Sequence, residues 1–455
     1  VRSLEGAPLI GKAELLSARG VLAWITNRRE DARNALAEAI SESNNLEEVY
    51  QAIATLELEA EQFEKAIEWW GEGIEADAGY LPHREGRGET YLQWGIVRAS
   101  QGEDPTNQYE QAIEDYRRSI GLGPDRGEGW FGRGVVRMTW AGFLEARGEN
   151  SEALYQSALS DFDEASRRTP VPSALWLSRG LANFNWGASK QARGEDPGSY
   201  YSSAVEDFNR ALKVNPNRDG IWYARGLARL NWGVYREEQN EDPVPLYQAA
   251  IEDLDEALSR NPGRVVAWIH RGLSYQNRAT YEGSMGRDPA SYYQKALRDF
   301  GQAFQIDPSR VELKQWMGEI RSGWGDELHL SGKDPSEQYK LAVGDFGVVL
   351  KVRPKQEGTW MVRGNVLLNL GAWQQDRGEN PTGAYEAALS DFETVIKMNP
   401  TWIGAWLDSG AALINMASFR QSRGEDPLSH YESALGKLNR AVVLDPKSAR
   451  ARWFR

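Results

Sequence analysis

The chain has 455 residues, a formal net charge of −13 at pH 7, no cysteine, and 41% hydrophobic residues. The missing cysteines exclude disulfides and thiolate chemistry. The acidic balance argues against nucleic acid as the main partner, since nucleic-acid-binding proteins usually carry a basic surface. No apolar run approaches the roughly 20 residues that a transmembrane helix needs, so we expect no membrane span.

The first part of the chain, residues 1–44, has loop signals at Gly6, Pro8 and Gly11. Helical periodicity follows over 13–26 and 30–41, without a match to any later segment. Residues 45–78 then read as a hairpin of two short helices, with Tyr50, Ala54, Ala66 and Trp70 at its apolar positions.

The stretch 194–216 reads as the turn and the second helix of a longer hairpin. Gly194 suits the left-handed end of a preceding helix, and Asp196 suits the N-cap of the next one. Pro197 fits the first helical position. We expect that helix to bury one stripe of apolar residues, which includes Tyr201 and Phe208.

The same pattern recurs every 46 residues across 79–446, which is room for eight units. The predicted N-caps share a short acceptor side chain: Asp104, Asn150, Asp196, Asp242, Asp288, Asp334, Asn380 and Asp426. Each unit ends on a proline: Pro124, Pro170, Pro216, Pro262, Pro308, Pro354, Pro400 and Pro446.

The first helix of most units carries a tryptophan, at Trp130, Trp176, Trp222, Trp268, Trp360 and Trp406. A glycine lies four residues after the tryptophan position in all eight units, including the two units without the tryptophan: Gly88, Gly134, Gly180, Gly226, Gly272, Gly318, Gly364 and Gly410. Glycine inside a helix costs up to about 1 kcal/mol. We therefore expect each glycine to allow close approach of a neighbouring helix.

This pattern resembles the tetratricopeptide repeat (TPR). Trp130, Gly134, Ala158, Phe162 and Pro170 match its consensus positions, and the resemblance covers roughly 45–446. The spacing between the tryptophan and the central alanine exceeds the family's by 12 residues. The resemblance implies an all-α solenoid, a right-handed superhelix of helical hairpins whose first helices line a concave groove.

The expected organisation has four parts. Residues 1–44 form an N-terminal helical cap, because a solenoid must cover its terminal apolar face. Residues 45–78 form one hairpin of ordinary TPR length, and 79–446 form eight extended units, whose helices lengthen to about 19 and 17 residues. Residues 447–455 begin a further helix. We expect the chain, which starts on Val1, to belong to a longer protein with further domains.

No constellation of residues predicts catalysis, a cofactor or a metal. The histidines His83, His270, His329 and His430 lie far apart and lack metal-ligand spacing. The Gly-Glu-Asp turns line up carboxylates that could suggest calcium, but each Asp is expected to cap its own helix. We therefore expect a protein that is not an enzyme.

A row of arginines follows the same period: Arg87, Arg133, Arg179, Arg225, Arg271 and Arg363. It could bind phosphates. The favoured alternative is internal pairing with a row of carboxylates on the second helices: Asp115, Asp161, Asp207, Asp253, Asp299, Asp345 and Asp391.

The candidate binding face lies on the first helices, opposite the stripe of tryptophan and glycine. Its amides are Asn185, Asn231, Asn277, Asn369 and Asn415. Its aromatic residues, four positions later, are Phe143, Tyr235, Tyr281, Trp373 and Phe419. An amide both donates and accepts hydrogen bonds, which suits the backbone of an extended peptide. We expect the face to be accessible to solvent in the free protein at Asn231, Asn277, Asn369, Tyr235, Tyr281 and Trp373. The alternative is that the aromatic rings only pack between neighbouring first helices.

The sixth unit departs from the pattern. Lys314 occupies the tryptophan position, Met317 the arginine position, Gly323 the asparagine position and Glu327 the aromatic position. Either the solenoid bends at this unit or a partner docks there.

The leading hypothesis for function is a scaffold that binds a peptide or protein segment in its concave groove. The alternatives are a regulatory or docking arm of a larger multidomain bacterial enzyme, linked to a kinase or protease, and, more weakly, an RNA-binding helical repeat.

Overall fold

The computed structural model describes residues 11–43, 47–168 and 174–447. The helix expected within 447–455 lies almost wholly outside the described residues. In the described ranges 81% of the residues are helical and none lies in a strand, which confirms the predicted all-α class. None of the described helices is long and apolar enough to cross a membrane.

The helices form two compact units, and the boundary between them falls between Glu241 and Asp242. These two compact units are larger than the 46-residue units of the repeat. The first contains α1 (Lys12–Ile25), α2 (Arg29–Glu42), α3 (Glu47–Glu59), α4 (Phe63–Ala76), α5 (Leu81–Ser100), α6 (Thr106–Leu122), α7 (Gly127–Ala146), α8 (Glu152–Ser166), α9 (Leu175–Ala192), α10 (Gly198–Val214) and α11 (Asp219–Glu238). The second contains α12 (Val244–Arg260), α13 (Val265–Ser284), α14 (Ala290–Ile306), α15 (Glu312–Leu330), α16 (Ser336–Val352), α17 (Glu357–Asp376), α18 (Thr382–Met398), α19 (Ile403–Ser422) and α20 (Leu428–Leu444).

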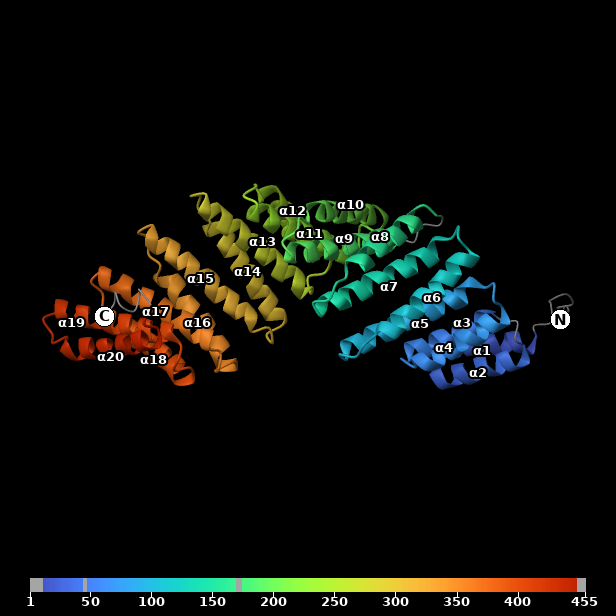
Figure 1. Cartoon of the computed structure of the whole chain (residues 1–455), viewed down its shortest axis with the longest axis horizontal. Coiled ribbons are helices and arrows are strands. Elements are labelled where there is room, and N and C mark those ends of the chain that lie inside the picture. Colours follow the sequence, from blue (N-terminus) through green and yellow to red (C-terminus); the bar gives the residue numbers. More distant parts are fainter. Residues whose placement is uncertain (1–10, 44–46, 169–173, 448–455) are drawn as a thin grey trace, which may run out of the picture. The chain divides into compact units, whose positions relative to one another are not determined.

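Within each unit, consecutive helices pack as hairpins and each hairpin packs on the next (Figure 1). In a hairpin such as α5 and α6, the two helices have 20 and 17 residues. These lengths agree with the expected lengthening of both helices. Successive first helices, such as α5, α7 and α9, also contact one another, although less extensively than the two helices of one hairpin. Each unit is therefore a TPR-like α-solenoid.

The turns inside the hairpins have the predicted conformation. Gly194 has a φ of 74°, and the glycines at the equivalent positions have similar values, while Asn240 adopts a φ of 59° where the glycine is missing. The Asp196 carboxylate accepts the backbone N–H of Gly198 at 2.8 Å, and all eight predicted caps make the equivalent bond. The following helix begins at Gly198, one residue later than expected.

Replacing Asp196 with alanine should lower the stability of the adjoining turn by about 1 kcal/mol, because the N–H of Gly198 loses its acceptor. Hydrogen exchange at the start of α10 would measure this loss. A melting temperature that rose with calcium in the parent protein, but not in the Asp196→Ala variant, would instead show that the turn binds a metal.

The glycine row on the first helices has a different reason from the one expected. A Cβ at Gly134 would meet the ring of Phe162 on the second helix at 2.7 Å, rather than another backbone. A phenylalanine ring fills the equivalent space in four other units: Phe208 at Gly180, Phe300 at Gly272, Phe346 at Gly318 and Phe392 at Gly364. These phenylalanines are fully buried. The expected close approach of two backbones is therefore wrong, because an aromatic ring occupies the gap.

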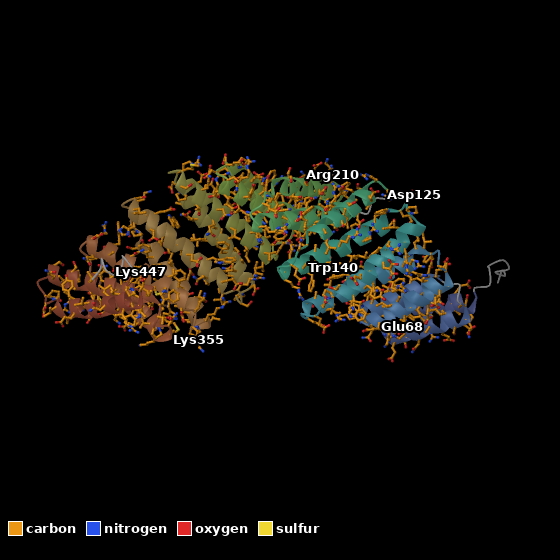
Figure 2. All side chains as sticks on the ribbon, in the orientation of Figure 1. Glu68, Asp125, Trp140, Arg210, Lys355 and Lys447 are labelled. Carbon is orange, nitrogen blue, oxygen red and sulfur yellow. The ribbon has the colours of Figure 1, made fainter. Side chains whose placement is uncertain are left out.

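Figure 2 shows the side chains that cover the helices. Exposed charges of both signs occur on each unit, such as Glu68 on the first and Lys355 on the second. The described surface therefore agrees with a chain whose core lies between the helices of each hairpin and its neighbour.

Candidate functional site

The arginine row on the first helices is paired internally, as the favoured interpretation predicted. In the hairpin of α7 and α8, the guanidinium of Arg133 donates to both carboxylate oxygens of Asp161, at 3.0 and 2.7 Å. The same two-bond pair joins Arg87 to Asp115, Arg179 to Asp207, Arg271 to Asp299, and Arg363 to Asp391. These five arginines therefore serve the hairpins and are not a phosphate track.

In five units the tryptophan of the first helix packs against this arginine. The guanidinium carbon of Arg271 lies 4.6 Å from the centre of the Trp268 ring, within the range of a cation–π contact. The indole N–H of Trp268 donates to the carbonyl of Pro262 at 2.8 Å, and Trp222, Trp360 and Trp406 make the equivalent bond. The Trp-x2-Arg motif therefore joins the end of one hairpin to the interior of the next.

Burial governs the protonation of these carboxylates. It raises the pKa of Asp207, Asp299 and Asp391 above the usual value, although the paired arginine acts in the opposite direction. Each of these carboxylates is almost fully buried. The pairs thus carry a desolvation cost that the paired arginine offsets in large part.

The sixth unit keeps this pairing by another route. Met317 removes the usual arginine, but the Lys314 ammonium lies 2.8 Å from a carboxylate oxygen of Asp345, and Arg321 contacts the other oxygen. The loss of the motif at this unit therefore does not leave its buried carboxylate unpaired.

The predicted amide row is partly buried at all five positions, Asn185, Asn231, Asn277, Asn369 and Asn415. The amide of Asn369 donates to Asp326 of α15 at 3.1 Å, and that same carboxylate accepts the hydroxyl of Tyr339. The amide of Asn415 interacts with the Tyr385 hydroxyl. The expectation that Asn369 is free for a ligand is therefore wrong, because its amide joins two neighbouring first helices.

The predicted aromatic row is partly buried at Phe143, Tyr235, Tyr281 and Phe419, but Trp373 is only 7% exposed. Its ring packs edge-on against His329 of α15, with 5.1 Å between the ring centres. The expected solvent exposure of Trp373 is therefore wrong, since the ring fills the gap between α15 and α17.

Arginines from the turns cover several of these rings. The guanidinium of Arg147 lies 5.5 Å from the Phe143 ring centre. The corresponding distances are 5.6 Å for Arg377 on Trp373, 5.7 Å for Arg423 on Phe419, and 5.9 Å for Arg287 on Tyr281. The sequence analysis did not predict that arginines pack on these rings. The spacing could have indicated it, because three of these arginines lie four residues after the aromatic position and therefore on the same helical face.

Cavities open near the turns of the hairpins in three of the repeats, and each is lined in part by the latter half of a first helix. Asn231 of α11 lines the first, of about 310 Å³, together with Gln191 and Tyr201. Glu327 of α15 lines the second, of about 410 Å³, and Phe419 of α19 the third, of about 260 Å³. An amide or aromatic position of the predicted face therefore borders a cavity in three of the repeats.

The side chains that line these cavities are of mixed polar and apolar character. Among the described residues, no group of three or more His, Asp or Glu side chains is placed to hold a metal ion. The cavities combine amides, carboxylates and aromatic rings with apolar walls. Such a lining can hydrogen-bond and pack against a ligand.

No protein-family model matches the chain, and no curated protein does. Solved structures do show a likeness. The TPR protein YrrB, described as having an unusual peptide-binding site, is 16% identical, with 54% of this chain and 95% of that chain covered and a TM-score of 0.34. A tetratricopeptide repeat protein from Parabacteroides merdae is 15% identical, with coverages of 67% and 96% and a TM-score of 0.41. The human IFIT1 dimer with PPP-AAAA is 13% identical, with coverages of 92% and 81% and a TM-score of 0.39. Because every TM-score is below 0.5, no site or ligand is transferred from these proteins to this chain.

Proposed function

We propose that the chain is a non-catalytic scaffold that binds an extended segment of a partner protein along the turn-proximal face of its first helices. The observation that carries the proposal is a cavity that recurs near the end of a first helix in three of the repeats. Its lining includes Asn231 of α11 and Phe419 of α19. A cavity that recurs along the repeats suits a ligand that repeats, and an extended peptide backbone is one.

The contacts of the amide row restrict the proposal to part of the predicted face. Asn369 and Asn415 interact with neighbouring protein groups, so they are assigned to the structure of the solenoid. We keep Asn185, Asn231 and Asn277 as candidates for peptide contact. Phe143, Tyr235, Tyr281 and Phe419, which are only partly buried, supply the apolar contacts.

A double replacement, Asn231→Ala with Asn277→Ala, tests this function. Each amide that bonds a peptide backbone contributes on the order of 0.5–1.5 kcal/mol. We therefore expect the variant to capture its partner from a cell extract about five- to a hundred-fold less well, with an unchanged melting temperature. The control is Asn107→Ala, which replaces an exposed amide on the second helix α6.

Capture of the same proteins in the same amounts by the parent and the double variant would contradict the proposal. Binding of single-stranded RNA that weakens steeply with added salt would instead favour the RNA-binding alternative.

A further inference from the structure

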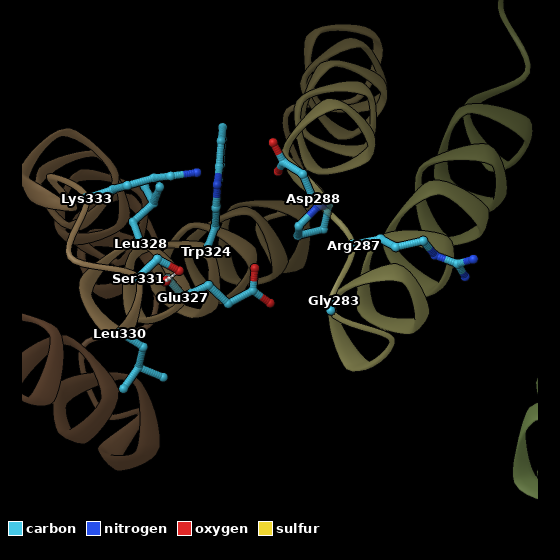
Figure 3. A pocket seen from close by; sticks show the side chains of 11 residues that line it. Gly283, Arg287, Asp288, Trp324, Glu327, Leu328, Leu330, Ser331 and Lys333 are labelled. Atoms are coloured by element: carbon cyan, nitrogen blue, oxygen red, sulfur yellow. Dashed lines mark hydrogen bonds between the residues drawn. The ribbon is translucent and has the colours of Figure 1, made fainter.

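The largest of the three cavities lies between the fifth unit and the divergent sixth unit. It is bounded by the end of α13, the turn before α14 and the last part of α15 (Figure 3). α13 and α15 contact each other less than α15 and α17 or α17 and α19 do. Gly323 of α15 presents no side chain toward a neighbour. The gap between these two first helices is therefore left open.

In three other units a turn arginine covers the corresponding position. Arg147, Arg377 and Arg423 each stack on the aromatic ring four residues earlier. The sixth unit replaces both partners, with Glu327 at the aromatic position and Ser331 at the arginine position. The Ser331 hydroxyl donates to the backbone carbonyl of Glu327 at 2.8 Å. The cavity therefore has a carboxylate at the position where those three units have an aromatic ring. It also lacks the guanidinium that packs on that ring.

Among the described residues, the Glu327 carboxylate accepts one side-chain hydrogen bond and forms no salt bridge. Its Oε1 accepts the hydroxyl of Tyr293 at 3.0 Å. Burial raises its pKa, and the nearby charge of Asp288 acts in the same direction. One carboxylate oxygen is thus left for a donor from outside the chain.

The basic residues at the rim are not placed to neutralise Glu327. Arg287 forms a salt bridge with Glu282, and its side chain points away from Glu327 in Figure 3. Lys333 is exposed in the turn after α15, its side chain runs toward Trp324 in the same view, and no salt bridge joins it to Glu327 among the described residues. These two positive charges also disfavour a run of several basic residues in the ligand.

We infer that this cavity binds one basic side chain, that of an arginine or lysine flanked by apolar residues, from the partner segment. The incoming cation takes the place of the missing turn arginine. It donates to Glu327, while Trp324, Leu328 and Pro289 line the space around its alkyl part. This inference rests on the proposed binding of a protein segment and specifies which segment is preferred.

A metal ion is a less suitable occupant. Only Asp288 and Glu327 offer carboxylates to the cavity, and Asp288 already accepts the backbone N–H of Ala290 at 3.0 Å. Calcium needs six to eight oxygen ligands. The cavity is therefore better suited to a single organic cation.

The test uses the full chain and three acetylated, amidated peptides of five residues: Ala-Leu-Arg-Leu-Ala, and the same peptide with citrulline or glutamate at the centre. Citrulline keeps the shape of arginine without its charge. Titrations followed by nuclear magnetic resonance, read at the Trp324 indole N–H, should give an affinity at least tenfold higher for the arginine peptide than for the other two.

Two variants locate the preference. Glu327→Gln should abolish it, so that the arginine and citrulline peptides bind equally. Ser331→Arg restores the internal guanidinium and should weaken binding of the arginine peptide at least tenfold. Glu319→Gln is the matched control, because it removes one exposed negative charge from the same helix.

Equal binding of the arginine and citrulline peptides to the parent chain, or no binding of either, would overturn the inference. So would a preference that survives Glu327→Gln. The proposed function fails on a different result, namely partner capture that ignores the replacement of Asn231 and Asn277, so the two failures can be told apart.

Discussion

Replacing Arg271 with alanine is expected to lower the free energy of unfolding of the second compact unit by about 3–5 kcal/mol. The reason is the carboxylate that remains. Asp299 is 2% exposed, and each of its carboxylate oxygens accepts a hydrogen bond from Arg271. A buried charge without its partner costs more than the pair itself contributes. Urea unfolding, read by hydrogen exchange in α13 and α14, measures the loss.

Two controls separate the buried charge from the general loss of a side chain. Asp299→Asn in the Arg271→Ala background removes the charge and should recover part of the loss. Arg310→Ala breaks an exposed ion pair with Asp307 in the same compact unit. It should change the free energy of unfolding by no more than about 1 kcal/mol. Equal losses for Arg271→Ala and Arg310→Ala would contradict the prediction.

The pH dependence of the Arg271→Ala variant follows from the same carboxylate. Burial already raises the pKa of Asp299 in the folded protein, and loss of Arg271 raises it further. For a group with a raised folded pKa, the penalty is complete above that pKa and disappears as the pH falls through it. The stability difference between the variant and the parent should therefore narrow on acidification from neutral pH.

The repeat period allowed much of the fold to be predicted. Gly194 and Asp196 specify a turn and a cap by local chemistry, which needs no knowledge of the neighbouring helices. The pairing of Arg271 with Asp299 was also predictable, because two rows with one period must meet in the same way in every unit. The structure confirms both features.

Burial depth was not predictable from the same pattern. Helical spacing places Asn369 and Trp373 on one face of a helix, but the depth of that face depends on the next hairpin. Here the neighbours are Asp326 and His329 of the sixth unit, the one that departs from the pattern. Helical spacing thus predicts which residues share one face of the helix. Which of those residues remain accessible depends on the packing of the neighbouring helices.

The glycine row illustrates the same limit. Gly272 clearly needed a reason beyond helix propensity, and close approach of a helix backbone was a reasonable expectation. Only the packing shows that the Phe300 ring fills the space. Propensity indicates that a residue is unusual, but it does not identify which neighbour requires it.

Replacing Phe300 with alanine should lower the free energy of unfolding of the second compact unit by about 3–5 kcal/mol. The reason is that a fully buried ring is removed and the helices can close only part of the space. The ring packs against Gly272 on one side and lies 5.8 Å from Trp316, centre to centre, on another. Thermal and urea unfolding of the full chain measure the loss. A loss below about 1 kcal/mol would show that the ring is not central to the hairpin contact.

A double-mutant cycle with Gly272→Ala tests whether the ring and the glycine act as a pair. In the parent chain the new Cβ would lie 2.7 Å from the ring, so overpacking of about 1–3 kcal/mol should outweigh the gain in helix propensity of up to about 1 kcal/mol. In the Phe300→Ala background the same methyl group enters vacated space, and the change should become stabilising. Gly301→Ala on α14, where a Cβ meets nothing within 4 Å, should stabilise both backgrounds equally. A Gly272→Ala effect of the same sign and size in both backgrounds would show that the glycine is required for some reason other than the ring.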